Sequence, residues 1–363
     1  AAAINNALLY RERERVSMAL QERLLPKALP RIPGLEAAAR YLPAHEWALA
    51  GGDFYDIFEM EAGHWKAVIG DVCGTGPAAA ALMGFVRFTA RAVSRGDVTP
   101  SQALTKLNAA LLEEIGPGSV DFCTCAIVRI VPHGGGARLV VAVGGHPLPL
   151  LVHPDGDVEE IGTPGTLLGV LEDVDVADTF AELAPGDTAI LLTDGVLEAS
   201  RDEHAEAAIH ELLAPIAGLH PESVADIVEA TVIGTEDRRP DDVAVIVLQA
   251  PLDAPPEGYR AREGLPGLLL FDAKGRWVDA NLRVLADLGA RRDQVVGARL
   301  DDLVVEPQDV ATELEAYLAE GTWSGEVTLR RPDGTTVRYR NESRLLSAAR
   351  RGPVHLSRLM PLG

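Results

Sequence analysis

The chain has 363 residues, of which 47% are hydrophobic and 24% are charged, and its mean hydropathy is +0.08. This length and composition are sufficient for two globular domains with sizeable apolar cores. The net charge of −21 disfavours nucleic acid and an anionic membrane as partners, and the lack of any run of 18 apolar residues excludes a transmembrane helix.

Cysteine usage and the start of the chain indicate where the protein works. Three cysteines, Cys73, Cys123 and Cys125, predict a reducing compartment, hence the cytoplasm, and no disulfide framework. Cys123 and Cys125 alternate onto one face of a predicted strand, where we expect a buried core pair. No signal-peptide pattern is present, and Ala1 in place of Met predicts a piece of a longer chain.

Residues 1–25 have the pattern of an amphipathic helix, with an apolar seam of Leu9, Val16, Leu20 and Leu24 and a charged run between them. One interpretation is a cap on the following domain. The other is a signalling helix that pairs with a second copy of itself, giving a homodimer. We favour the second and expect Leu9, Val16 and Leu20 to be buried in such a contact, because an isolated helix of this length is marginal.

From residue 35 to residue 250, predicted strands and helices come in blocks, which is typical of α+β layers. Thr99 and Pro100 have the residue types of an N-cap and a first helical position. The predicted elements are paired strands over 35–70, helices over 77–95 and 99–115, strands over 122–130, 138–143, 148–152 and 188–193, helices over 203–217 and 221–233, and a strand over 243–248.

Aspartates occur at the ends of four strand segments in this region. They belong to the sequences GGDFYD (51–56), GDVCGTG (70–76), TDG (193–195) and DD (241–242). Each lies against a strand apolar enough for the core, so we expect the carboxylates to converge rather than act as isolated turn formers. Gathered carboxylates repel one another and need a cation, and an all-oxygen ligand set suits Mg²⁺ or Mn²⁺.

In this order, the segments GGDFYD, GDVCGTG, TDGVLEA and DDVAVIVL resemble the metal-dependent PPM-type serine/threonine phosphatases, specifically their bacterial SpoIIE/RsbU branch. Supporting matches are LQERLLP (20–26), ARYLPA (39–44) and GGHPLPLL (144–151), and the resemblance covers about residues 17–250. It implies a four-layer α-β-β-α sandwich with metals at one edge of two antiparallel sheets.

The resemblance also implies roles for individual residues. Asp71 corresponds to the carboxylate that bridges two Mn²⁺ or Mg²⁺ ions, with the backbone carbonyl of Val72 on one of them. Asp194 and Asp241 correspond to ligands of the other ion, and Asp53 to a ligand that binds directly or through water. Asp71, Asp194 and Asp241 are thus the expected catalytic residues.

The implied activity is hydrolysis of phosphoserine or phosphothreonine in a protein. In this family the usual substrate is a phosphorylated STAS-domain antagonist of an anti-sigma factor, in a partner-switching pathway that regulates stress responses. The alternative is a non-catalytic regulatory protein with a degenerate phosphatase fold, because Cys73 and Thr75 stand where relatives often have histidines. His146, in the GGHPLPLL match, is expected to be a structural turn residue rather than a metal ligand.

The composition changes after Gln249. Residues 251–262 are predicted to be a Pro-rich linker. Beyond it, two predicted hairpins surround the turns DAKG (272–275) and RPDG (331–334). With Asn281 and the segment QVVGARLDDLV (294–304), they resemble a PAS sensor domain over 263–363. His355 is a lone candidate haem ligand in this part, and we expect it to have no such role. The expected division of the chain is therefore a helix over 1–25, a phosphatase domain over 26–250, the linker and the PAS-like domain.

Overall fold

A computed structural model describes residues 24–44, 51–61, 63–118, 120–199, 205–234, 241–305, 321–346 and 353–362. The predicted apolar seam Leu9, Val16 and Leu20 lies outside the described residues. Within them, no helix is long and apolar enough to span a membrane.

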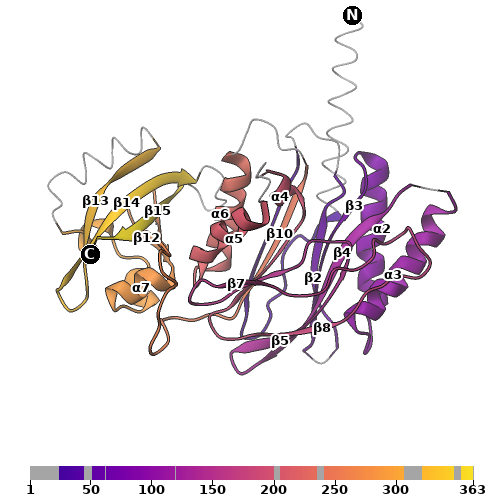
Figure 1. Cartoon of the computed structure of the whole chain (residues 1–363), viewed down its shortest axis with the longest axis horizontal. Coiled ribbons are helices and arrows are strands. Elements are labelled where there is room, and N and C mark those ends of the chain that lie inside the picture. The colour runs from indigo at the N-terminus through magenta and orange to yellow at the C-terminus, as the bar shows by residue number, and fades with distance from the viewer. Residues whose placement is uncertain are drawn as a thin grey trace, which may run out of the picture.

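Two five-stranded antiparallel sheets form the centre of the first domain (Figure 1). One sheet has the order β1 (Glu36–Leu42), β10 (Val243–Gln249), β9 (Thr188–Leu192), β6 (Leu150–Val152) and β7 (Val158–Glu160). The other has the order β2 (Phe54–Glu59), β3 (Trp65–Val72), β4 (Cys123–His133), β5 (Gly136–Gly144) and β8 (Thr179–Leu183). Apolar side chains from both sheets, including Ile69, Val128 and Ile246, form the layer between them.

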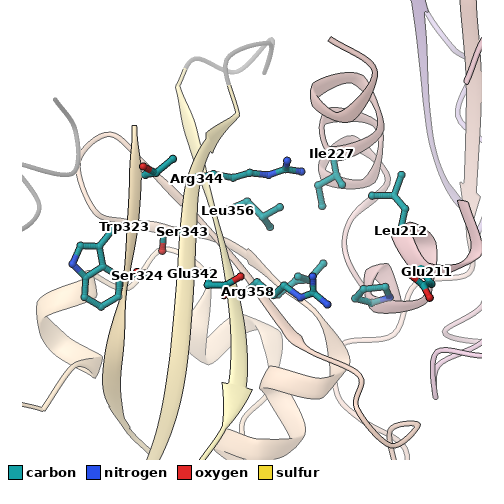
Figure 2. A pocket seen from close by; sticks show the side chains of 13 residues that line it. Glu211, Leu212, Ile227, Trp323, Ser324, Glu342, Ser343, Arg344, Leu356 and Arg358 are labelled. Atoms are coloured by element: carbon teal, nitrogen blue, oxygen red, sulfur yellow. The ribbon is translucent and has the colours of Figure 1, made fainter. Parts of the chain in front are cut away.

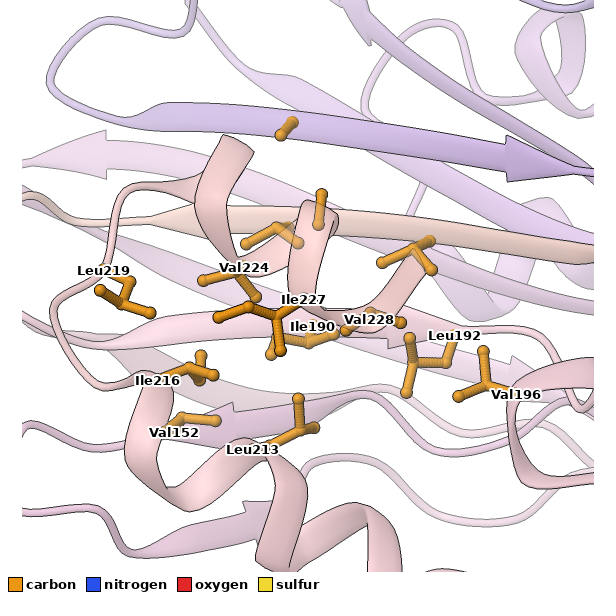
Figure 3. Close-up of a cluster of buried hydrophobic side chains, with 14 of the residues drawn as sticks. Val152, Ile190, Leu192, Val196, Leu213, Ile216, Leu219, Val224, Ile227 and Val228 are labelled. Atoms are coloured by element: carbon orange, nitrogen blue, oxygen red, sulfur yellow. The ribbon is translucent and has the colours of Figure 1, made fainter. Parts of the chain in front are cut away.

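Helices cover the outer face of each sheet. The first pair is α2 (Pro77–Val93) and α3 (Pro100–Ile115), and the described helices over the other sheet are α4 (Gly195–Ala199), α5 (Ala205–Leu213), the 3₁₀ turn η1 (Ala214–Ile216) and α6 (Pro221–Gly234). Figure 3 shows Ile227 and Val228 of α6 packed above Ile190 and Leu192 of β9. The predicted four-layer α-β-β-α sandwich is confirmed.

Local sequence signals place the boundaries of α2 and α3. Thr99 caps α3, since its hydroxyl accepts from the Gln102 amide at 3.4 Å while the Gln102 side chain accepts from the Thr99 amide at 3.2 Å. Gly76 precedes α2 with φ of 90°, a conformation that favours glycine, and Pro77 occupies the first turn. Both helices lie where the sequence predicted them. Cys123 and Cys125 point into the apolar layer beneath these helices and are fully buried, as expected.

The C-terminal part is a separate antiparallel sheet with short helices. Its strands have the order β12 (Trp277–Ala280), β11 (Gly267–Asp272), β15 (Val354–Pro361), β14 (Thr336–Leu346) and β13 (Thr322–Arg330). The described helices are α7 (Leu282–Leu288), α8 (Arg292–Val295) and α9 (Leu300–Leu303). Both predicted hairpins, β11–β12 and β13–β14, are present. His355 is buried and its ring stacks on Phe271 at a centroid distance of 5.0 Å.

The C-terminal sheet is docked onto the outer helices of the first domain. The amide of Leu282 donates to the Ala217 carbonyl at 3.0 Å, and Asn281 Nδ2 donates to the Pro215 carbonyl at 2.7 Å. Leu346 and Leu356 belong to the same apolar cluster as α5 and α6. The segment between η1 and α6 is therefore held by specific hydrogen bonds as well as by apolar packing.

Candidate metal centre

Asp71 lies at the end of β3, a strand that is buried along most of its length. The glycine pair before β2 passes directly against this end, and the Val72 amide donates to the Gly52 carbonyl at 3.1 Å. A Cβ on Gly52 would lie 2.0 Å from the Val72 carbonyl oxygen and 2.4 Å from Asp71 Oδ1. Glycine is required here because any side chain would occupy the space in front of two of the predicted oxygen ligands.

Asp53 is held by a residue that the sequence analysis did not single out, Thr193. The Thr193 hydroxyl donates to Asp53 Oδ2 at 2.7 Å and accepts from the Ala244 amide at 2.8 Å. Asp53 is only 2% exposed, so this bond helps to compensate its carboxylate for lost water. Since Asp53 precedes β2 and Thr193 follows β9, the bond also links the two sheets at this edge. The one signal in the sequence is that Thr193 directly precedes Asp194.

Asp241 and Asp242 have different environments and different roles. Asp242 is 3% exposed, and its Oδ1 accepts from the Ala44 amide at 2.7 Å. It packs so closely on the GGD segment that a Cβ on Gly51 would lie 1.1 Å from Asp242 Oδ2. Asp241 is more exposed, and its carboxylate accepts from the Asp242 amide at 2.7 Å. Asp242 thus has a structural role, whereas Asp241 remains at the accessible edge.

Asp194 follows β9 and leads into α4. A Cβ on the next residue, Gly195, would lie 2.0 Å from the Asp242 carbonyl oxygen, so glycine is needed after Asp194, where the end of β9 meets the start of β10. Glu198 on α4 is close enough to be affected by these carboxylates. Burial, followed by the charges of Asp194 and Asp241, raises the pKa of the Glu198 carboxyl. The structure therefore brings segments from β9 and β10 to the same edge.

The carboxylates interact strongly with one another. Burial, followed by the charges of Asp194 and Asp241, raises the pKa of Asp71 to about 7. Burial and Asp71 raise the pKa of Asp53 well above its usual range, against the effect of the Thr193 hydrogen bond. Burial and Asp241 raise the pKa of Asp194. All four predicted aspartates thus contribute to one region of negative potential, which a cation would relieve.

This donor set fits divalent cations that prefer oxygen. The oxygen groups at this edge are carboxylates and the Val72 carbonyl, and Gly52 has no side chain to occupy the space beside Asp71 Oδ1 and the Val72 carbonyl oxygen. Among the described residues, however, no three His, Cys, Asp or Glu side chains are already gathered tightly enough to hold an ion. The residues present are therefore of the right chemical type, at a spacing wider than a closed coordination shell.

Nitrogen and sulfur groups near the site have other roles. His146 Nδ1 lies 2.9 Å from the Thr124 hydroxyl, and Thr124 is opposite Asp71 in the β3–β4 register. Burial lowers the pKa of His146 to about 3, so its imidazole is neutral and structural, as expected. Burial, followed by the charge of Asp71, raises the pKa of the Cys73 thiol, which therefore remains protonated near neutral pH.

Comparison with known proteins agrees with this arrangement. Residues 61–251 match the family described as Stage II sporulation protein E (SpoIIE), and residues 266–352 match the family described as PAS domain. Phosphoserine phosphatase RsbU of Bacillus subtilis is 26% identical over 180 residues, which are 49% of this chain and 51% of the relative. Protein IcfG of Synechocystis is 24% identical over 205 residues, 50% of this chain and 32% of the relative. The chain thus spans about half or less of the length of these relatives.

Solved structures share the fold at low sequence identity. The SiaA-PP2C domain of Pseudomonas aeruginosa superposes with a TM-score of 0.55 and 20% identity, covering 69% of this chain and 98% of that one. The RsbU and RsbW domains of Rv1364c from Mycobacterium tuberculosis superpose with a TM-score of 0.54 and 22% identity, covering 93% and 95%. Because the Stage II sporulation protein E family matches more than half of the sequence and its neighbours share the observed sandwich, this chain belongs to the SpoIIE family.

Proposed function

We propose that the chain is a protein phosphatase that hydrolyses phosphoserine or phosphothreonine with two Mn²⁺ or Mg²⁺ ions. The observation that carries the proposal is the convergence of Asp53, Asp71, Asp194 and Asp241 on one edge of the sheets, where burial and neighbouring carboxylates raise the pKa values of Asp53, Asp71 and Asp194. When bound, divalent ions activate water for attack on phosphorus and offset the charge of the phosphoryl oxygens.

The chain's own residues have distinct parts in this proposal. Asp71, the Val72 carbonyl, Asp194 and Asp241 would hold the two ions, and Asp53 would bind an ion directly or through water. Thr193 orients Asp53 through the 2.7 Å hydrogen bond. Cys73, two residues after Asp71, stands where some relatives have a histidine, and this proposal gives its thiol no catalytic role.

The substrate is proposed to be a phosphorylated STAS-domain antagonist of an anti-sigma factor, in the cytoplasm. The support is the similarity to RsbU, whose name describes a phosphoserine phosphatase. We further propose a phosphatase domain over 26–250, a linker over 251–262 and a PAS sensor domain over 263–363, preceded by a helix over 1–25 that pairs two copies of the chain.

The decisive experiment measures hydrolysis of a model aryl phosphate and of a phosphoserine peptide by the purified chain, with Mn²⁺ and with a chelator. We expect Mn²⁺-dependent turnover that Asp71→Asn abolishes without unfolding the protein. The matched control is Asp97→Asn, since Asp97 is exposed and pairs with Arg129 away from the site.

Two outcomes would count against the proposal. Near-normal Mn²⁺-dependent turnover in Asp71→Asn would contradict the role of Asp71. A wild-type chain without turnover on either substrate, but with an intact melting transition, would favour the alternative of a non-catalytic regulatory protein.

A further inference from the structure

The interdomain cleft, a cavity of about 800 Å³, lies between the C-terminal sheet and the α5–η1–α6 segment (Figure 2). Its lining is largely polar, and Glu211 and Glu342 offset the charges of Arg344 and Arg358. The buried polar residues beside the candidate metal centre are less completely matched. One of them, His146, has a ring nitrogen without a regular hydrogen bond among the described residues.

His146 lies in the segment between β5 and β6 and is 6% exposed. Its Nδ1 atom lies 2.9 Å from the Thr124 hydroxyl. Its Nε2 atom is buried and is the nitrogen that forms no regular hydrogen bond with the residues that the structure describes. A buried polar atom without a partner costs stability, and an apolar side chain at this position would avoid that cost. We therefore expect the imidazole to contribute something other than stability.

Thr124 connects this ring to the strand that carries Asp71. Thr124 and Asp71 are direct partners in the antiparallel β3–β4 register, so their side chains lie next to each other on one face. Ile69, two residues before Asp71, belongs to the apolar layer between the two sheets, and residues two apart on a strand share a face. Asp71 and Thr124 therefore face the opposite sheet, near the end of β3.

The opposite sheet approaches the same ring at the end of β9. Leu192 is the last residue of this strand, and its backbone is close enough to His146 to raise the pKa of the imidazole, against the larger effect of burial. Asp194 is two residues further along the chain. His146 thus lies between a neighbour of Asp71 on one sheet and the strand end that leads to Asp194 on the other.

We propose that His146 is a positioning residue of the metal centre, which fixes the separation of Asp71 and Asp194 by bracing the two sheets at this edge. The inference rests on the proposed function, since these aspartates must bind ions. A neutral side chain is suited to this role because it holds the carboxylates in place without offsetting the negative charge that attracts the ions. The bond between Thr193 and Asp53 is a second link between the same two sheets.

The test measures Mn²⁺ binding to the whole chain by electron paramagnetic resonance of the free ion, a readout that needs no turnover. His146→Leu fills the space without ring nitrogens and should weaken Mn²⁺ binding at least about tenfold, the loss expected when a group that orients metal ligands is removed. His146→Asn can place its amide close to the position of Nδ1 and keep the Thr124 contact. The asparagine variant should therefore bind Mn²⁺ within a few-fold of the wild type.

Further variants separate positioning from stability. Thr124→Val removes the other partner of the 2.9 Å contact and should weaken Mn²⁺ binding by a factor similar to that of His146→Leu. The double variant should bind no more weakly than either single one, because both substitutions remove the same brace. The matched control is His153→Asn, since His153 Nδ1 lies 3.0 Å from Asp187 at the opposite end of β9, and this variant should bind Mn²⁺ like the wild type.

The inference is overturned if His146→Leu or Thr124→Val binds Mn²⁺ like the wild type, or if His146→Asn binds as weakly as His146→Leu. It is also overturned if His153→Asn weakens binding equally, because the loss would then follow any buried histidine contact. If His146→Leu does not fold, Thr124→Val at its half-buried position decides the question. A wild-type chain that binds no Mn²⁺ would instead refute the proposed metal centre itself, and this inference with it.

Discussion

Replacing Thr193 with valine tests whether the bond between the two sheets orients Asp53. Valine keeps the branched shape of threonine but removes the hydroxyl that donates to Asp53 Oδ2 at 2.7 Å and accepts from the Ala244 amide at 2.8 Å. Asp53 is 2% exposed, so water does not readily replace the lost donor. A hydrogen bond to a charged group contributes about 1.5–3 kcal/mol, which corresponds to a factor of about 10–150 in affinity.

The assay is the Mn²⁺ concentration that gives half-maximal hydrolysis of an aryl phosphate. In Thr193→Val this concentration should rise about 10–100-fold, as expected when a partner that orients a ligand is lost. Thr193→Ser keeps the hydroxyl and should remain within a few-fold of the wild type. The reasoning would be refuted if valine and serine variants had the same Mn²⁺ dependence as the wild type, or if both lost it equally.

The remaining predictions concern stability. Arg40 is 2% exposed on β1 and holds Glu222, Asp226 and Glu229 of α6 at 2.8, 2.5 and 3.2 Å, so Arg40→Met should cost about 3–5 kcal/mol in urea unfolding by removing the cation that these carboxylates share. Arg338→Met, which removes an exposed ion pair, should change the midpoint little, and equal effects of the two substitutions would contradict this account. In the presence of a chelator, the stabilising contribution of protonated Asp71 is fully present below about pH 4 and is lost as pH rises through about 7, because the folded-state pKa is raised. The melting temperature of the chelated protein should therefore fall between pH 5.5 and 8 by more in the wild type than in Asp71→Asn, and parallel pH profiles of the two proteins would count against the raised pKa.

Much of the secondary structure follows from short-range signals. Thr99, Pro100 and the glycines at 76 and 116 mark the ends of α2 and α3, because caps and first-turn residues act within a few positions of the chain. The hairpins β11–β12 and β13–β14 were predictable for the same reason, since each is closed by a short turn. The acidic residues at strand ends were also recognisable, because the apolar strands that precede or follow them are continuous in sequence.

Pairings between distant segments were decided only by the tertiary structure. β1 pairs with β10, about two hundred residues later, and Thr193 reaches Asp53 across the two sheets. Such contacts depend on how whole layers pack, and no local pattern encodes which polar group will meet which. The different roles of Asp241 and Asp242 have the same origin, since both directly precede β10 and only the packing of Asp242 against Gly51 shows which of the two is buried.

The sequence also did not predict how the two domains dock. The composition of residues 251–262 indicates a linker, and the hairpins beyond it indicate a second domain. The sequence by itself therefore predicted most of the helices and strands and the acidic residue types of the candidate site, but not β7, β8 and β15. Only the tertiary structure decided that Asn281 bonds to the Pro215 carbonyl and that a cleft with Arg344 remains between the domains, because docking depends on the shapes of surfaces assembled from residues far apart in the chain.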